Sequence, residues 1–220
     1  MARHRILLGA ALIALSASRP LAAQERLQDW QNRWYWGAKG GLLTYTLPTF
    51  GTVRVAQVGG EWMITARRIA FYLGYSTTFQ AESDTFPVKG LSGTNNGVTF
   101  DAFRRIQIGV LAMIGDKPLQ PYIGGGFAIH SLSNARSAPP SPQPPSPTVS
   151  DDIKSAASGG FFQIMAGVQL RFAGKGALFG QYQYSAQGHD FLLAGGANSF
   201  EVGLRWAFLP SKENDPTRRP

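Results

Sequence analysis

The chain has 220 residues, enough for a single domain, and its 44% hydrophobic and 15% charged residues are typical of a folded protein. This composition excludes intrinsic disorder of the whole chain. Cysteine is absent, which excludes a disulfide framework, a thiolate metal site and a lipid anchor on an N-terminal cysteine.

The first residues have the three-part layout of a secretory signal peptide. Arg3 and Arg5 precede an apolar run over residues 6–15, and small residues follow to position 23. The run is too short to cross a bilayer as a helix, and a buried helix here would end abruptly at Pro20. We therefore predict a signal peptide over residues 1–23 and an exported protein.

Removal of this signal would lower the formal net charge from +8 to +5, because it holds three arginines and no acidic residue. A basic exported protein favours anionic lipid headgroups over nucleic acid as partners, and a scattered basic surface would explain the same balance. The polar segment 24–33 follows, and we expect it to lie in the periplasm ahead of the first strand.

From residue 34 onwards, apolar and polar residues alternate with the two-residue period of β-strands. The alternation is clearest in the last segment, SFEVGLRWAF, where Phe200 and Val202 fall on one face and Glu201 and Arg205 on the other. In chain order, the predicted strands cover residues 34–45, 53–64, 68–79, 97–114, 119–130, 160–172, 177–187 and 199–208.

The connections between these strands alternate in length. The longer ones cover residues 46–52, 80–96, 131–158 and 188–198, and the tight turns cover 65–67, 115–118 and 173–176. In an up-and-down arrangement alternate connections share one end, so all long loops lie at one rim and all tight turns at the other. The longest loop contains APPSPQPPSPT, whose prolines cannot join a ladder, so we predict an extended or disordered external loop there.

Two architectures fit a chain made of such strands: a soluble barrel or sandwich with apolar side chains inside, and a membrane barrel with apolar side chains outside. Four of the five tryptophans, at positions 34, 36, 62 and 206, map to the tight-turn rim, as expected of an aromatic belt at a membrane interface. Long and short connections are segregated as in outer-membrane proteins. We therefore predict an all-β fold, an antiparallel up-and-down eight-stranded transmembrane β-barrel over residues 34–208.

The polar face of each strand would then point into a barrel narrow enough for side chains to fill. Because acids and bases are both present there, we predict a plugged interior held by ion pairs. The charged residues assigned to this interior network are Lys39, Glu61, Arg68, Arg105, Arg171, Glu201 and Arg205. We predict no catalytic residue, cofactor or metal site, because no ligand or nucleophile set with a suitable spacing stands out.

Arg104 is an exception, because its position places it on the apolar face of the fourth predicted strand. It lies about ten residues from the turn at Gly115, roughly the length that crosses the hydrocarbon of a membrane. One interpretation puts Arg104 at the outer headgroup level, in contact with lipopolysaccharide phosphates. The other is a bulge at Arg104 and Arg105 that turns the side chain away from lipid.

The segments WYWGAKGGLL, PYIGGGFAIH and SFEVGLRWAF resemble the small outer-membrane β-barrel superfamily, which includes the transmembrane domain of outer-membrane protein A and the outer-membrane protein X and W types. The resemblance covers about residues 34–208, and its motifs are generic to the architecture. It implies that the last strand is the recognition signal for the barrel assembly machinery, with Leu204, Trp206 and Phe208 at the matching positions. The polar tail over residues 209–220, expected in the periplasm, departs from the family by making that signal internal.

Three functions remain open on these grounds. The leading hypothesis is a non-enzymatic outer-membrane protein with a structural or surface-interaction role, and the second is a narrow pore for small solutes. The third is lipid A modification, because the string HSLSN from His130 is similar to the His/Ser pair of lipid A 3-O-deacylases, which are also eight-stranded barrels. In that family the serine stands two residues after the histidine, where this chain has Leu132.

The predicted location is the outer membrane of a bacterium with a two-membrane envelope, with both termini in the periplasm. The expected partners are outer-membrane lipids, including lipopolysaccharide, and the barrel assembly machinery. We expect a monomer and no nucleic-acid partner, and the sequence does not specify what the external loops bind.

Overall fold

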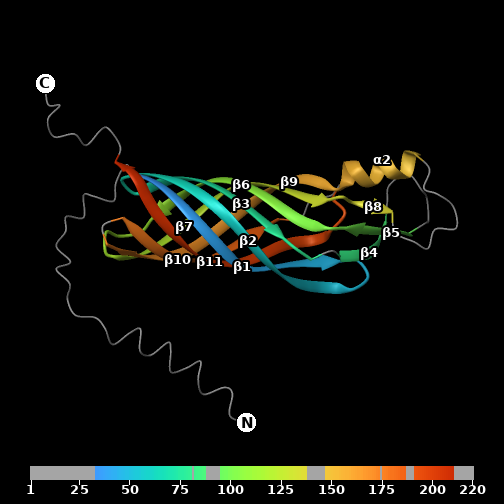
Figure 1. Ribbon diagram of the computed structural model, residues 1–220, viewed down its shortest axis with the longest axis horizontal. Helices are drawn as coiled ribbons and strands as arrows, with labels where there is room; N and C mark the ends of the chain where they lie inside the picture. The colour runs from blue at the N-terminus through green and yellow to red at the C-terminus, as the bar shows by residue number, and fades with distance from the viewer. Residues whose placement is uncertain are drawn as a thin grey trace, which may run out of the picture.

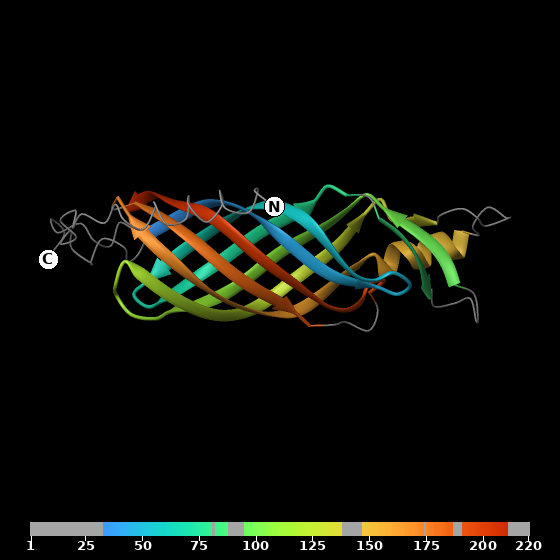
Figure 2. The same ribbon diagram turned by 90° about the horizontal axis from the view of Figure 1, so that it is seen from below.

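The computed structural model describes residues 33–80, 82–87, 95–137, 147–173, 175–186 and 191–210, and its main element is a closed antiparallel β-barrel. Eight strands form the barrel in the spatial order β1, β11, β10, β9, β7, β6, β3 and β2. Their bounds are β1 Arg33–Leu47, β2 Gly51–Ala66, β3 Ile69–Thr78, β6 Ala102–Met113, β7 Leu119–Ser133, β9 Ser158–Phe172, β10 Gly176–Ser185 and β11 Ala194–Pro210. The strands are steeply inclined to the barrel axis (Figures 1 and 2).

One end of the barrel carries additional structure. Three short strands, β4 (Glu82–Pro87), β5 (Asn95–Phe100) and β8 (Arg136–Ser137), form a separate sheet in the order β4, β5, β8. The helix α2 (Pro147–Ala156) lies beside them (Figure 1). We call this end the cap end and the opposite one the turn end. Within the described ranges, no helix has the length and apolar character needed to cross a membrane.

The predicted fold class and strand order are confirmed. All eight predicted barrel strands exist, and the first and last pair with each other from Arg33 opposite Pro210 to Thr46 opposite Ala194, which closes the barrel. The barrel strands therefore start and end at the turn end. Residues 1–32 and 211–220, which include the predicted signal peptide and most of both flanking segments, lie outside the described residues.

Three predictions for the connections are wrong. The fourth predicted strand, 97–114, is divided at Asp101, because β5 leaves the barrel there to pair with β4, which lies in the predicted loop 80–96. The predicted loop 131–158 holds the end of β7, the strand β8 and α2. Residues 138–146, most of the proline-rich stretch predicted to be extended or disordered, lie outside the described residues. Pro147 begins α2, where the missing N–H costs nothing because the first helical turn has no intrahelical partner for it.

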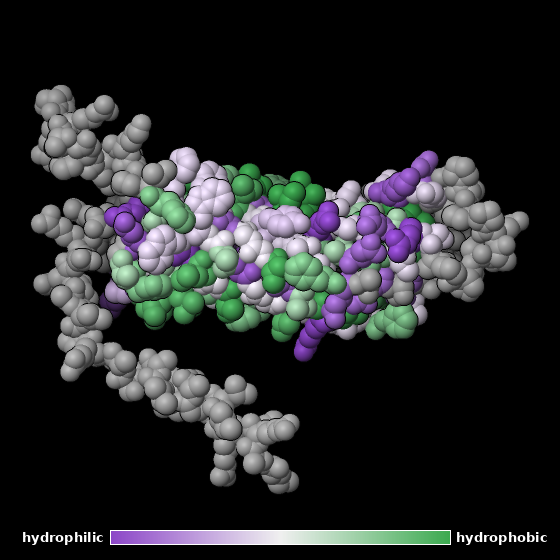
Figure 3. All heavy atoms as spheres, viewed as in Figure 1, coloured by the Kyte–Doolittle hydropathy of each residue, from purple (hydrophilic) through white to green (hydrophobic). Residues whose placement is uncertain are grey.

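The outer face of the barrel is apolar, so the soluble alternative with apolar side chains inside is wrong. Most outward-facing aliphatic and aromatic residues are more than a third exposed, as are Phe71, Ile108, Ile164 and Leu204. Figure 3 shows hydrophobic residues over the barrel wall and hydrophilic ones gathered mainly toward the cap end. On β6 and the turn after it, the outward apolar residues run from Ile106 to Ile114, a height of about 20 Å for a tilted strand.

Toward the cap end, the apolar residues of the strands lie on the inner face of the barrel and no longer on the outer face. On β1, Leu42 is the last exposed apolar residue, and beyond it Leu43, Tyr45 and Leu47 point inward and are 1–2% exposed. The same change occurs on β6, where Phe103 is buried inside and Arg104 is exposed outside. Above this level the barrel has an apolar inside and a polar outside, which is the ordinary arrangement for a protein surrounded by water.

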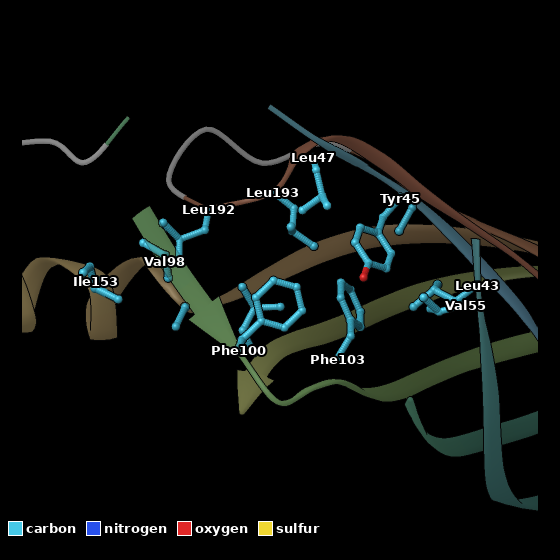
Figure 4. Close-up of a cluster of buried hydrophobic side chains, with 13 residues drawn as sticks. Leu43, Tyr45, Leu47, Val55, Val98, Phe100, Phe103, Ile153, Leu192 and Leu193 are labelled. Atoms are coloured by element: carbon cyan, nitrogen blue, oxygen red, sulfur yellow. The ribbon is translucent and has the colours of Figure 1, made fainter. Parts of the chain in front are cut away.

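The interior is arranged in three layers along the axis. At the turn end lies an apolar cluster of Tyr35, Met63, Ala70, Tyr72, Leu111, Met113, Tyr122, Met165 and Ala207. The middle layer is polar and holds the charged side chains described below. At the cap end lies a larger apolar cluster that reaches from the barrel strands to β5 and α2, and we call it the cap core (Figure 4).

Candidate functional site in the barrel interior

Glu201 on β11 is the centre of the polar layer. It points inward because inward and outward residues alternate along the strand, and its side chain is 0% exposed. Oε1 accepts hydrogen bonds from Nη2 of Arg105 at 2.9 Å and from the amide of Gln57 at 3.0 Å. Oε2 accepts from Nζ of Lys39 at 2.9 Å and from the amides of Gln181 and Gln183. One carboxylate therefore ties together five side chains from strands around the barrel.

Lys39 on β1 uses all three of its ammonium protons. Besides the ion pair with Glu201, Nζ donates to the hydroxyl oxygen of Tyr72 at 2.8 Å and to the amide oxygen of Gln107 at 3.0 Å. The ammonium also lies 5.5 Å from the centre of the Tyr72 ring. These acceptors replace the water that a lysine loses on burial, so the charged form is supported inside the barrel.

A second ion pair lies nearer the turn end. Nε of Arg205 on β11 donates to Oε1 of Glu61 on β2, and Nη1 donates to the amide oxygen of Gln169 at 3.0 Å. The guanidinium lies 3.8 Å from the centre of the Phe179 ring and 5.3 Å from that of Tyr122. Hydrogen bonds in the guanidinium plane and aromatic contacts on its faces together hold Arg205 in place.

Inward-facing glycines make room for the large side chains of this layer. A Cβ at Gly74 would lie 2.5 Å from the hydroxyl oxygen of Tyr72, and one at Gly167 would lie 2.6 Å from that of Tyr122. Both phenols donate to or accept from the polar network, so a side chain at either glycine would displace part of it. Small and large residues thus alternate to fill a narrow barrel.

The cap core closes the interior above the polar layer. The rings of Tyr45 and Phe103 stack with their centres 5.4 Å apart, and Phe100 of β5 is 0% exposed (Figure 4). Ile153 of α2 and Leu192 of the last loop complete the cluster from outside the barrel. Elements beyond the barrel wall therefore contribute to a continuous apolar core that covers its mouth.

His130 lies at the boundary of the polar layer and the cap core. It is 2% exposed, and its ring lies 4.6 Å from that of Phe161, 5.1 Å from that of Phe103 and 6.1 Å from that of Phe191. Ser131 occupies the opposite face of β7, and Leu132 points inward with His130. His130 therefore points into the barrel and is enclosed by three phenylalanines.

Five of the seven residues predicted for the interior network meet there: Lys39, Glu61, Arg105, Glu201 and Arg205. Of the other two, Arg68 is exposed and its prediction is wrong, and Arg171 is partly buried at the turn-end rim. Arg68 lies in the tight turn before β3, with its side chain 71% exposed and Nη2 3.5 Å from a carboxylate oxygen of Asp116. Arg171 lies near the end of β9, and its Nη2 donates to the carbonyl oxygens of Asp116 and Lys117 at 2.7 and 2.6 Å.

The alternation of side chains fixes their direction only within a strand, and Arg68 lies in the turn between β2 and β3. Two further members of the network were not predicted: Gln57, which bonds both Arg105 and Glu201, and Ser199, whose hydroxyl oxygen accepts from Arg105. Gln57 is four residues from Glu61 on β2, and Ser199 is two residues from Glu201 on β11. The two-residue alternation of a strand would therefore have placed both side chains inside. The cap core could have been recognised from the apolar inward positions of Leu43, Tyr45 and Leu47.

The remaining site residues lie on the outer face. Arg104 is exposed, and β6 pairs in unbroken register through Arg104 and Arg105 with both neighbouring strands, so there is no bulge here. Its neighbours across the ladder are Thr77 and Ser131. The three residues predicted for assembly, Leu204, Trp206 and Phe208, point outward on β11 and are 46%, 39% and 63% exposed.

The aromatic belt predicted at the turn end is present. The rings of Trp34 and Trp62 lie 5.3 Å apart, those of Trp36 and Trp62 lie 6.4 Å apart, and Trp62 also contacts Phe71. Trp206 pairs with Trp36 across the ladder between β1 and β11. Tryptophans from three neighbouring strands therefore form one patch on the outer face near the turn end.

Comparisons with known proteins identify the architecture. No protein-family model and no curated protein sequence matches the chain. Among solved structures, neisserial surface protein A is similar with a TM-score of 0.52 and 13% identity, covering 80% of this chain and 97% of that protein. The outer membrane protein OprG of Pseudomonas aeruginosa gives a TM-score of 0.48 with 11% identity, covering 82% of this chain and 98% of that one.

The N-terminal β-barrel domain of Pseudomonas aeruginosa OprF gives a TM-score of 0.44 with 13% identity, covering 81% of this chain and 98% of that domain. Together with the closed eight-stranded barrel, the likeness to neisserial surface protein A shows that the chain has the fold of the small outer-membrane β-barrels. The resemblance noted in the sequence is confirmed at the level of the fold.

Proposed function

We propose that the chain is a non-enzymatic integral protein of a bacterial outer membrane, with a plugged barrel that has a structural or surface-interaction role. The observation that carries this proposal is the reversal of the usual protein arrangement over the barrel wall. Ionised side chains are buried around Glu201, while aliphatic and aromatic ones face outward over a band about 20 Å high. In water, both the buried charges and the exposed apolar band would be unfavourable. In a bilayer the apolar band is stabilised by lipid, and the charged side chains must lie inside the barrel.

The interior supports a closed barrel more than a pore. The polar layer is bonded across the barrel by two carboxylates and three cations, and apolar clusters lie on both sides of it. An ion passing along the axis would have to break these bonds and cross the cap core. Removing one partner of a buried ion pair costs about 3–5 kcal/mol, so spontaneous opening would be infrequent.

The arrangement of the ends supports an orientation. The start of β1, the end of β11 and three short connections lie at the turn end, and three long connections lie at the cap end (Figure 1). The fourth connection at the cap end, between β1 and β2, is short: the predicted longer loop 46–52 is reduced to residues 48–50. In outer-membrane barrels the short turns are periplasmic and the long loops are external. The cap, with β4, β5, β8 and α2, would then be the part presented outside, and both termini would be periplasmic.

Two contacts with envelope components belong to this proposal. On β6, Ile106 is the exposed apolar residue nearest the cap, and Arg104 is the next outward residue in that direction. Arg104 would therefore lie at the outer headgroup level and pair with lipopolysaccharide phosphates. The outward side chains of Leu204, Trp206 and Phe208 would form the signal that the assembly machinery recognises before insertion. The barrel would act as a monomer, because closure leaves no free strand edge in its wall.

Two measurements on the mature chain test the proposal. Insertion should make the protein migrate faster in detergent gels before heating than after heating, and fractionation should recover it with outer membranes. In planar bilayers the inserted protein should give no reproducible channel openings. Steady conductance would support the narrow pore instead, and recovery in the soluble fraction would exclude both.

The enzymatic alternative has its own test. His130→Ala should leave lipid A unchanged compared with cells that carry the unaltered chain, because His130 is buried among Phe103, Phe161 and Phe191. Loss of a lipid A modification in that variant, with normal amounts of inserted protein, would restore the enzyme hypothesis.

A further inference from the structure

Each of the three tight turns at the turn end carries exposed cations. Arg67 and Arg68 stand between β2 and β3, Lys117 stands between β6 and β7, and Lys175 stands between β9 and β10. The one acidic residue in these turns is Asp116. Because the barrel order places the three turns at separate points of the rim, the cations form a ring around the turn end, which we call the basic rim.

Most of the basic rim has no internal counter-ion among the described residues. Arg68 lies 3.5 Å from Asp116, whereas Arg67, Lys117 and Lys175 form no ion pair with a carboxylate in the described part of the chain. At the cap end, Arg136 pairs with Asp101 and Lys154 pairs with Asp151, while the exposed Arg54 and Arg104 have no ion pair with a described residue. Unpaired charge of one sign at one end of the molecule fits a partner of the opposite charge.

The turns that carry these cations are held together. The backbone N–H of Met113 donates to the carbonyl oxygen of Arg68, and that of Ala207 donates to the carbonyl oxygen of Lys175. Arg171 donates to two carbonyl oxygens of the turn that holds Lys117. The spacing of the cations around the rim is therefore fixed by the fold and does not depend on mobile loops.

The depth of the basic rim follows from the outward apolar residues beside it. Arg67 is two residues from Ile69, Lys117 is two from Leu119, and Lys175 is three from Phe172. All three apolar residues are exposed on the outer face. Two or three residues of a tilted strand advance about 5–8 Å, and the headgroup layer on each side of a bilayer is about 5–7 Å thick. The cations therefore fall within the layer of lipid phosphates.

We propose that the basic rim is a binding surface for anionic glycerophospholipids in the leaflet next to the turns. This inference rests on the proposed function, because it needs the barrel to be in a membrane. The ammonium and guanidinium groups would pair with the phosphate and the net negative charge of a headgroup such as phosphatidylglycerol. Zwitterionic headgroups carry a compensating cation and would bind more weakly.

The tryptophan patch gives a direct readout, because Trp34, Trp36, Trp62 and Trp206 lie on the outer face near the same rim. The mature protein is placed in phosphatidylcholine vesicles with increasing fractions of phosphatidylglycerol brominated on its acyl chains. Bromine quenches tryptophan fluorescence at short range. The dependence of the fluorescence on the fraction of brominated lipid therefore gives the relative affinity of the anionic lipid at this rim. We expect phosphatidylglycerol to be preferred about fivefold, and less at 1 M NaCl.

Two triple variants, each of which removes three positive charges, distinguish the effect of the basic rim from the effect of the net charge of the protein. R67Q/K117Q/K175Q should bring the preference close to one, and R54Q/R136Q/K154Q, which alters exposed cations at the cap end, should keep it. Equal affinity for the two lipids in the unaltered protein, or a full preference in the rim variant, would overturn the proposal. Absence of quenching by brominated phosphatidylcholine would show that the barrel is not inserted, and would overturn the proposed function with it.

Discussion

The wall of the barrel and its cap follow opposite rules although the same strands run through both. Over the wall, β1 has Lys39 inside and Leu42 outside, and toward the cap it has Leu43 and Tyr45 inside and Thr44 outside. The strand keeps its two-residue alternation throughout. What changes is which face is apolar: the outer face over the wall and the inner face toward the cap. This change marks where the surroundings of the barrel would change from lipid to water.

The change occurs at the same level on three neighbouring strands, β3, β6 and β7. The polar outward residue beyond Ile106 on β6 is Arg104, and its partners across the ladder, Thr77 and Ser131, are polar as well. Arg104 is an exception to the apolar pattern of the sequence. It is the first outward residue of β6 on the cap side of the apolar band. A belt of polar residues next to an apolar band indicates a membrane boundary more precisely than the ends of the strands do.

The two regions also differ in what holds them together. Ion pairs and amide hydrogen bonds connect strands across the polar layer, and each polar atom buried there needs its partner. The cap is held by apolar contacts, such as those of Phe100, Phe103 and Ile153. Substitutions should therefore have different effects according to the region in which they lie, and the following predictions use that difference.

The largest effect is expected from Glu201→Leu in the polar layer. The substitution leaves Lys39 and Arg105 buried without their carboxylate, which should lower the free energy of unfolding by about 3–5 kcal/mol. Urea unfolding in detergent micelles, followed by tryptophan fluorescence, measures this. Ser199→Ala on the same face is the control, because it removes one hydrogen bond to Arg105 and should cost about 1 kcal/mol. Equal losses in both variants would argue against a central role for Glu201.

Sequence parity was sufficient for the barrel and for most of its interior, because the strand period itself decides which side chains share a face. It placed Lys39, Glu61 and Arg205 inside with no knowledge of the fold. It could not show that Glu201 accepts from both Lys39 and Arg105. Lys39 lies on the neighbouring strand β1, but Arg105 on β6 reaches Glu201 across the barrel, and that contact depends on strand tilt and register.

Parity failed where the chain leaves the regular ladder. The alternation continues through Asp101 without a break, so the sequence put Phe100 on the lipid face, whereas it is fully buried in the cap core. At the other end, Arg68 lies in the turn before β3, where a turn and not a strand sets the direction of the side chain. The helix α2 was missed because its residues adjoin a proline-rich segment that predicts extended chain.

A somewhat smaller effect is expected when one substitution is placed in each region. Ile108→Lys puts a charge on the wall between Leu73 and Phe127, where it should destabilise the inserted barrel by about 2–4 kcal/mol. Thr52→Lys puts the same charge on the outward face of β2 near the cap, where the cost should stay within about 0.5 kcal/mol. Refolding into vesicles over a range of urea concentrations gives both values. Similar costs at the two positions would mean that the change of the apolar face does not mark a membrane boundary.

The smallest of these effects is expected from Ile153→Ala in the cap core, and it should be local. Ile153 is 1% exposed and connects α2 to the apolar cluster, so its truncation should cost about 2 kcal/mol. The wall has its own network around Glu201, so the lost energy should appear as faster hydrogen exchange in α2 with unchanged exchange in the barrel strands. Lys154→Ala on the exposed side of the same helix should leave both rates unchanged. If Ile153→Ala instead accelerates exchange throughout β1 and β11, the cap and the wall unfold as one unit, and the two regions differ in solvent but not in stability.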